Sequence, residues 1–171
     1  MDNMNPNTVQ LQEELGHIAD QIEEAGHQMN LLAGKGFSGE IVSVVRNWIS
    51  SKERSLNDRG FTLAYRLAPN ELPDLVPDIL NWIDSDRYHP QTFHLLGMLS
   101  RAELQRILVP EVFRRLSEDT SLDYYMWWRF ACLFSHLGLE REVGRVAALA
   151  LTHPNPEVRE MGQDMVTDLY D

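Results

Sequence analysis

Glutamate and histidine pairs near the N-terminus have a spacing that could bind a metal. Glu14 lies three residues before His17, and Glu24 lies three residues before His27. Two Glu-x-x-His pairs can hold a carboxylate-bridged metal pair, but such a site takes them from different helices. Here both pairs fall on one predicted helix and point about 80° apart around it, at 100° per residue. The sequence therefore predicts a solvated acidic face, no metal site and no cofactor.

The glycine-rich stretch GKGFSG, residues 34–39, matches the spacing G-x-G-x-x-G. Phosphate binding by that pattern requires a strand that ends in a tight glycine turn, followed by the amino end of a helix. A helical pattern precedes this stretch and no strand pattern is near it. We therefore interpret residues 34–37 as a glycine-rich linker.

Cys132 is the single cysteine, and His136 follows it by one helical turn. A thiol needs an adjacent base and an oxyanion site before it can act as a nucleophile. The sequence around Cys132, RFACLFSH, is mostly apolar and marks no oxyanion site. We predict that Cys132 packs among aromatic side chains and that the chain is not an enzyme.

The stretch SLDYYMWWRFACLFSHLG, residues 121–138, carries the most informative side chains. Drawn as a helix, it has an apolar arc of Leu122, Met126, Phe130, Leu133, Phe134 and Leu137, with Trp127 at its edge. The rest of the circumference holds Tyr124, Tyr125, Trp128, Arg129 and His136. Tyrosine, tryptophan and arginine are enriched at the energetic centres of protein interfaces. The arc that holds Tyr124, Trp128 and Arg129 is therefore predicted to be a binding face. The alternative is that neighbouring helices bury both arcs.

The rest of the chain must position this arc, and its pattern is helical throughout. Apolar residues recur at spacings of three and four, and runs of alternating polarity are absent. Ser100 with Glu103 fits a capping box, Asn155 an N-cap before Pro156, and Pro90 the first turn of another helix. The predicted fold class is all-α.

Several phrases return at a spacing of 32 to 34 residues. Asn-Trp-Ile at 47–49 recurs at 81–83, LVPDIL at 75–80 is echoed by LVPEVF at 108–113, and the His-Pro at 89–90 recurs at 153–154. Such a period is the signature of a helical repeat. We predict four antiparallel helix pairs, over residues 38–68, 70–99, 102–137 and 139–170.

The repeats resemble those of the HEAT-like family. LTHPNPEVREMGQDMV, residues 151–166, places Pro156, Val158 and Arg159 as that family does, and ELPDLVPDILNWIDSD resembles its first helix. Gln91-Thr92 stands where the family has Val-Arg. The resemblance covers residues 38–171 and implies a short α-solenoid whose second helices line a concave groove. It would place Tyr124, Trp128 and Arg129 in that groove, bordered by Arg66, Gln91 and Gln163.

Stacked repeats bury a continuous core, so we expect Trp48 and Trp82 to fill equivalent core positions. Pro77 and Pro110 sit at matching places inside predicted helices, where each removes a hydrogen bond and bends its helix. Their pairing predicts a kink shared by two repeats.

An additional helix is predicted over residues 1–33. Its apolar positions follow a heptad seam of spacing 4-3-4-3-4-3, formed by Leu11, Leu15, Ile18, Ile22, Ala25, Met29 and Leu32. This amphipathic helix either caps the first repeat or pairs with a partner or a second copy. The predicted domains are this helix, the linker 34–37 and a repeat domain over 38–171.

The chain has 171 residues, with 15 Lys and Arg against 26 Asp and Glu, a formal net charge of -11. A field of that sign repels phosphate backbones and anionic membranes, and it attracts basic proteins. Solubility alone is the other interpretation of the charge. One cysteine, no signal-peptide pattern and no long apolar run predict a cytoplasmic protein.

The function expected from these features is non-enzymatic binding of a basic protein by a monomer or weak homodimer. By analogy of size, charge and architecture, an immunity protein or inhibitor that neutralises a toxin, such as a nuclease, would fit. A scaffold assembled through the heptad helix is the alternative. A helical-repeat enzyme, such as a DNA-repair glycosylase, is less expected, because it would need a basic groove and this chain is acidic.

Overall fold

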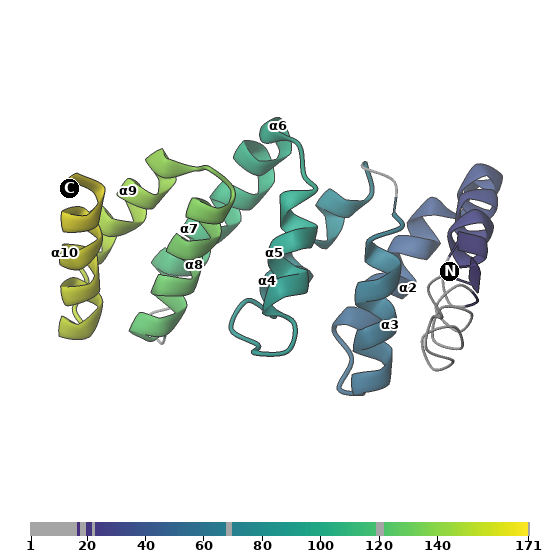
Figure 1. Cartoon of the computed structure of the whole chain (residues 1–171), viewed down its shortest axis with the longest axis horizontal. Helices are drawn as coiled ribbons and strands as arrows, with labels where there is room; N and C mark the ends of the chain where they lie inside the picture. The colour runs from purple at the N-terminus through teal and green to yellow at the C-terminus, as the bar shows by residue number, and fades with distance from the viewer. Residues whose placement is uncertain (1–16, 18–19, 22, 68–69, 119–121, 171) are drawn as a thin grey trace, which may run out of the picture. The chain divides into compact units, whose positions relative to one another are not determined.

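The computed structural model describes residues 17, 20–21, 23–67, 70–118 and 122–170. Within those residues every regular element is a helix, as the sequence predicts. The chain divides into two compact units, Met1–Ala68 (unit 1) and Pro69–Asp171 (unit 2). Unit 2 holds the aromatic helix identified from the sequence, and Figure 1 shows the helices in order along the chain.

Unit 1 contains a helix over residues 23–32, the π-helical turn η1 (Ala33–Phe37), and the antiparallel pair α2 (Ser38–Ile49) and α3 (Arg54–Ala64). The predicted linker at 34–37 is thus a distorted helical turn. It has a kink at Gly36, whose φ of 92° favours glycine. Of the predicted heptad seam, Leu11, Leu15, Ile18 and Ile22 lie outside the described residues.

Two features hold α3 against the end of α2. Gly60 brings the helices so close that a Cβ at this position would lie 2.7 Å from the Ile49 backbone nitrogen. Asn57 is buried, and its Nδ2 group donates to the carbonyl oxygens of Trp48, Ile49 and Ser51 at 2.9–3.0 Å. One side chain therefore caps carbonyls at the end of α2 and in the turn that follows it.

Unit 2 is built from three helix pairs. The first is the 3₁₀ turn η2 (Leu72–Leu75) and α4 (Val76–Leu80) with α5 (His89–Gly97). The second is α6 (Arg101–Glu103), the π-helical segment η3 (Leu104–Leu108) and α7 (Val109–Glu118) with α8 (Tyr124–His136). The third is α9 (Glu140–Ala150) with α10 (Pro156–Tyr170). The bounds of these helices fall within a few residues of the predicted helical segments.

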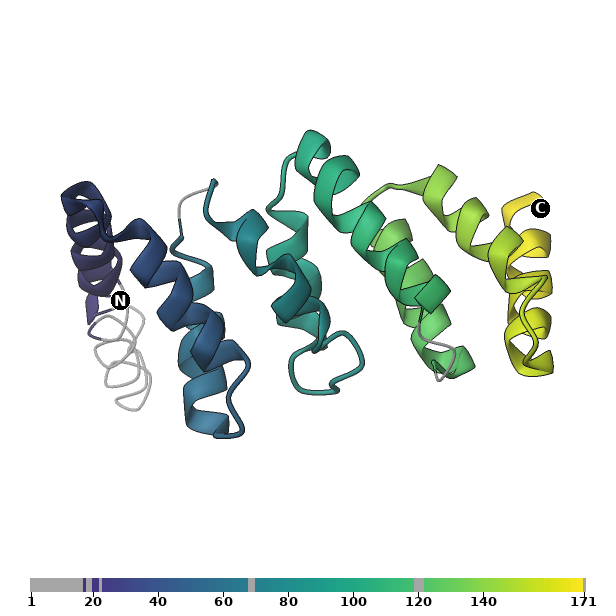
Figure 2. The same ribbon diagram turned by 180° about the vertical axis from the view of Figure 1, so that it is seen from behind.

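Neighbouring pairs of unit 2 are joined by contacts between corresponding helices. Arg115 of α7 donates to the Pro77 carbonyl of α4 at 2.7 Å, and the Arg145 guanidinium of α9 lies 4.1 Å from the Phe113 ring of α7. On the other side, the rings of Phe93 of α5 and His136 of α8 are 5.3 Å apart. Helix α10 contacts both α8 and α9, and Figures 1 and 2 show it beside α9 at the C-terminal end of the chain.

The predicted helix starts are confirmed. Ser100 and Glu103 form a reciprocal capping box, Pro90 lies in the first turn of α5, and Asn155 Oδ1 accepts from the Glu157 N–H at 2.9 Å. Pro77 and Pro110 do occupy matching places, each as the second residue of an α-helix that follows a 3₁₀ or π-helical segment. A proline lacks the N–H that would continue a regular helix through these points.

The expectation for the repeated tryptophans is wrong. Trp48 and Trp82 are only partly buried, whereas the following Ile49 and Ile83 are completely buried. On α2 the buried side chains are Val42, Val45 and Ile49, at spacings of three and four. A residue next to Ile49 points about 100° away from it, so Trp48 lies at the edge of the core.

Candidate functional site: a groove between α8 and α10

Helix α8 separates the two arcs of the aromatic stretch as its periodicity requires. Its N-cap is Asp123, whose carboxylate accepts from the Met126 N–H at 3.0 Å. The buried face carries Trp127, Phe130, Ala131, Leu133 and Phe134. Tyr124, Tyr125 and Trp128 are 47%, 38% and 42% exposed, which is high for such large rings. The alternative that both arcs are buried is therefore wrong.

Tyr124 and Trp128 face α10 across a cavity of about 410 Å³. They lie one helical turn apart on α8. The opposite wall is formed by Met161 and three carboxylates, Glu157, Glu160 and Asp164, which lie on α10 at spacings of three and four. We call this cavity the acidic half of the groove. It combines aromatic faces with negative charge.

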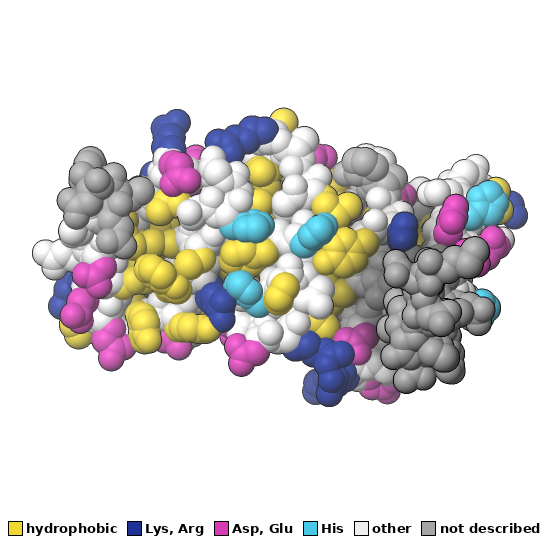
Figure 3. Space-filling view, viewed as in Figure 1, with side chains coloured by type: hydrophobic (Ala, Val, Ile, Leu, Met, Phe, Trp, Pro, Cys, Tyr) yellow, Lys and Arg dark blue, Asp and Glu magenta, His cyan; other side chains and the backbone are white. Residues whose placement is uncertain are grey.

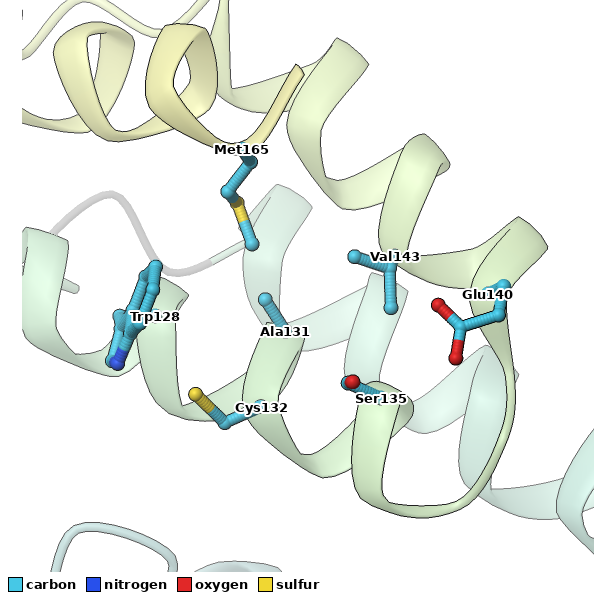
Figure 4. Close-up of a pocket in the computed structure, with 7 residues that line it drawn as sticks. All are labelled: Trp128, Ala131, Cys132, Ser135, Glu140, Val143 and Met165. Atoms are coloured by element: carbon cyan, nitrogen blue, oxygen red, sulfur yellow. The ribbon is translucent and has the colours of Figure 1, made fainter. Parts of the chain in front are cut away.

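A second cavity of about 390 Å³ continues the groove along α8. Trp128 belongs to both cavities and so forms their common wall. The lining, drawn in Figure 4, is completed by Ala131, Cys132 and Ser135 of α8, Glu140 and Val143 of α9, and Met165 of α10. Ala131, Val143 and Met165 are largely buried, so we call this cavity the apolar half.

The charged side chains that line the groove are all acidic. Among the described residues, no Lys, Arg or His lines either half, and Glu157, Glu160 and Asp164 form no ion pair. Unit 2 as a whole carries nine arginines against 17 Asp and Glu, a net charge of -8. Figure 3 shows hydrophobic side chains gathered on this face, with acidic side chains at its border.

The other predicted site residues of α8, Tyr125, Arg129 and His136, lie on the side that faces α5. The Arg129 guanidinium lies 4.6 Å from the Tyr125 ring and donates to its hydroxyl, and it approaches Asp86 at 4.0 Å. His136 lies beside Phe93 of α5. Tyr125, Arg129 and His136 therefore form a second cluster, away from the groove. Gln91 is half-buried on α5 and lines neither half of the groove.

Two further predicted residues lie outside both clusters. Gln163 is exposed on α10 but lines neither half of the groove. Arg66 belongs to unit 1, where its Cδ lies near Gly26 of the helix over 23–32.

Two titratable groups of unit 2, the Cys132 thiol and the His89 imidazole, are poorly suited to catalysis. Burial raises the pKa of the Cys132 thiol, which keeps it protonated near neutral pH and weakens it as a nucleophile. Burial, together with the charge of Arg129, lowers the pKa of His89 below its usual value. Neither group is paired with the other in a nucleophile–base arrangement.

Two other motifs of the sequence could do chemistry, the Glu-x-x-His pairs and the glycine-rich stretch, and Glu14 of the first pair lies outside the described residues. In the part of the chain that the structure describes, no three His, Cys, Asp or Glu side chains are placed to hold a metal ion. The GKGFSG stretch runs through η1 into α2 and follows a helix, so its glycines do not form a phosphate loop.

The acidic wall of the groove was missed by the sequence interpretation. Glu157, Glu160 and Asp164 recur at helical spacing, with Met161 and Met165 beside them. That periodicity was the available signal. An acidic stripe alone does not reveal which neighbouring helix it faces, and here the packing of α10 on α8 turns it towards Tyr124 and Trp128.

Comparison with known proteins gives no match: no protein-family model, no curated protein sequence and no solved structure matches this chain. Among the described residues, none of the helices combines the length and the apolarity needed to cross a membrane.

Proposed function

We propose that this protein is a non-enzymatic binding module, and that the groove between α8 and α10 recognises a basic segment of a protein partner. The observation that carries the proposal is the acidic half, where two exposed aromatic rings face three carboxylates that have no ion-pair partner among the described residues. An arginine or lysine side chain would place its charge over a ring and against the carboxylates.

The energies of the contacts that the acidic half can make favour a protein partner over a single small cation. A cation–π contact at an exposed site contributes about 0.5–1 kcal/mol, and a surface ion pair about 0–1 kcal/mol. A dissociation constant of about 1 mM already requires about 4 kcal/mol. One basic side chain in the acidic half would therefore bind weakly, and useful affinity requires further contacts along the groove.

The charge of unit 2 supports a basic partner and opposes nucleic acids and anionic membranes. A basic toxin, such as a nuclease, would be a partner of this kind, and the chain would then act as an immunity protein or inhibitor. That narrower role rests on charge and size.

We also propose a cytoplasmic location, on the ground of the single cysteine.

We infer that the helix pairs form a HEAT-like repeat array. Support comes from unit 2, where corresponding helices of successive pairs contact one another. Further support comes from Arg159, near the start of α10. Its guanidinium donates to the carbonyls of His153 and Pro154 at 2.7–2.8 Å and so holds the preceding turn against the helix. An arginine at this position is what the family resemblance implies.

The binding proposal is tested with a fluorescent peptide of alternating arginine and glycine, by anisotropy at low salt. Trp128→Ala should weaken binding about threefold or more, from the loss of a cation–π contact. A Glu160→Gln Asp164→Asn double variant should also weaken binding of the peptide, and it should make the affinity less dependent on salt concentration.

The matched control is a Glu53→Gln Asp84→Asn double variant, which removes two exposed charges from outside the groove. Circular dichroism melts establish that each variant is folded. If the groove variants and the control bind equally, the peptide is held by net charge alone and the proposal fails.

A second candidate function is self-association through unit 1. A cavity of about 360 Å³ in this unit is lined by Met29, Leu32, Phe37, Glu40, Ile41, Val44, Val45 and Leu63, almost all apolar. Leu32, Phe37 and Val44 are 44–48% exposed. A scaffold assembled through this surface would sediment as a dimer that Phe37→Glu dissociates, whereas a monomeric wild type would exclude this function.

A further inference from the structure

The two halves of the groove differ in chemistry but share one wall. The acidic half presents three carboxylates, whereas Ala131, Cys132, Val143 and Met165 leave the centre of the other half without a charge. Trp128 borders both, so a segment that enters one half continues into the other. A ligand that fills the groove therefore meets a charged site and then an apolar site.

The length of the groove follows from the α8 residues that line it. Tyr124, Trp128, Cys132 and Ser135 form a single ridge along the helix. At 1.5 Å per residue this ridge is about 16 Å long, and the centres of its two halves are about 8 Å apart. An extended chain advances about 3.3 Å per residue, so about two to three residues separate the two centres.

We propose that the groove reads a two-part motif: an arginine or lysine for the acidic half, and a bulky apolar residue about two to three positions away for the apolar half. The inference rests on the function proposed above and adds the sequence class of the partner. The basic residue supplies attraction and orientation. The apolar residue supplies the additional affinity that a single exposed cation site lacks.

The far end of the apolar half also disfavours negative charge in a ligand. Glu140, in the first turn of α9, stands at that end next to Ser135. An acidic residue beyond the apolar position would therefore be repelled. The motif is basic, then apolar, within a segment free of Asp and Glu.

Three peptides test the proposal, each built on a glycine–serine backbone of the same length. The Arg–Leu peptide carries both residues, three positions apart. The Arg–Ser peptide lacks the apolar side chain, and the Ser–Leu peptide lacks the cation. By titration calorimetry the Arg–Leu peptide should bind about threefold to tenfold more tightly than the Arg–Ser peptide, from partial burial of a leucine.

The single cysteine supplies a second readout that needs no substitution. Cys132 lines the apolar half, and no other residue of the sequence can be alkylated at a thiol. At saturating concentration the Arg–Leu peptide should slow the reaction of Cys132 with N-ethylmaleimide. The Arg–Ser peptide should bind yet leave the rate nearly unchanged.

A Cys132→Phe variant, which fills the apolar half, should bind both arginine peptides with equal affinity. Equal binding of both peptides by the wild type, with no protection of Cys132, would overturn the two-part motif and leave the binding proposal intact. Failure of every arginine peptide, or equally tight binding of the Ser–Leu peptide, would instead overturn the proposed recognition of a basic segment.

Discussion

Asn57 shows how much one polar side chain can determine in a helical protein. It is buried, and it donates to three carbonyl oxygens at the end of α2 and in the following turn. No charged or aromatic pattern marks it in the sequence. Its importance arises only when α3 folds back and carries the amide to the end of α2.

We predict that Asn57→Ala lowers the free energy of unfolding by about 1–3 kcal/mol, because the carbonyls lose a buried donor. Urea denaturation monitored by circular dichroism measures this change. Asn47→Ala is the control within unit 1, since Asn47 is exposed on α2, and it should change stability by less than about 0.5 kcal/mol. Equal effects of the two substitutions would show that the amide cap does not stabilise the fold.

Gly162 plays a related role in the last helix pair. A Cβ at this position of α10 would lie 2.9 Å from the Ala150 Cβ and 3.1 Å from the Ala147 carbonyl oxygen. The glycine therefore sets the close approach of α10 to α9. That approach also fixes the acidic wall of the groove.

Gly162→Ala should destabilise the protein by about 1–3 kcal/mol through overpacking, despite the better helix propensity of alanine. Gly144→Ala is the matched control in α9, because no neighbouring atom of the described residues lies within 4 Å of the Cβ that this substitution adds. It should be neutral or stabilising by up to about 1 kcal/mol. Thermal melts in which the two variants shift in the same direction would contradict the close-packing argument.

Among the elements, α7 is tied to its neighbours by a small ionic network. Glu111 accepts from Arg114 and Arg115 at 2.7–2.8 Å, and Arg115 also reaches the Pro77 carbonyl of α4. Hydrogen bonds from Arg114, and then from Arg115, lower the pKa of Glu111 to about 2. This carboxylate thus orients the arginine that joins two helix pairs.

Glu111→Gln should therefore cost about 1.5–3 kcal/mol of stability at neutral pH, the range for hydrogen bonds to charged groups. Because the folded pKa lies below the ordinary value of 4.5, the contribution is complete above pH 4.5 and is lost as the pH falls towards 2. Urea midpoints of wild type and variant should differ at pH 7 and converge near pH 2. A constant difference across this range would exclude the ionised carboxylate as the cause.

The helices themselves could be predicted from the sequence, since caps at Ser100 and Asn155 and the apolar periodicity are local signals. The exposed arc of α8 followed from the same periodicity. The groove could not be predicted, because its second wall depends on which face of α10 meets α8. The burial of Trp48 and Trp82 was also misjudged, since the repeated phrase marks the end of a helix, where the isoleucine takes the core position.

At the scale of the whole molecule, the net charge of -11 acts before any contact forms. Opposite charges speed diffusional encounter, and salt screens them over about 8–10 Å at physiological ionic strength. Most of this charge belongs to unit 2, which also contains the groove. The long-range field and the local site therefore favour the same class of partner.

The association rate of the arginine–glycine peptide should accordingly fall by about tenfold or more between low and high salt, as measured by stopped-flow fluorescence. Trp128→Ala should change mainly the dissociation rate, because it removes a short-range contact and no charge. A salt-independent association rate would make the acidic surface a feature of solubility alone.

The exposure of Trp128 among carboxylates also has an optical consequence. Its indole is 42% exposed in the groove, whereas that of the adjacent Trp127 is 1% exposed. Trp48 and Trp82 are partly buried. Collisional quenchers therefore reach Trp128 most readily, and the negative potential around it attracts caesium and repels iodide. Caesium should quench a fraction of the emission that iodide barely reaches, and Trp128→Phe should reduce this difference. The protein thus carries a built-in fluorescent probe of the electrostatic potential in its own groove.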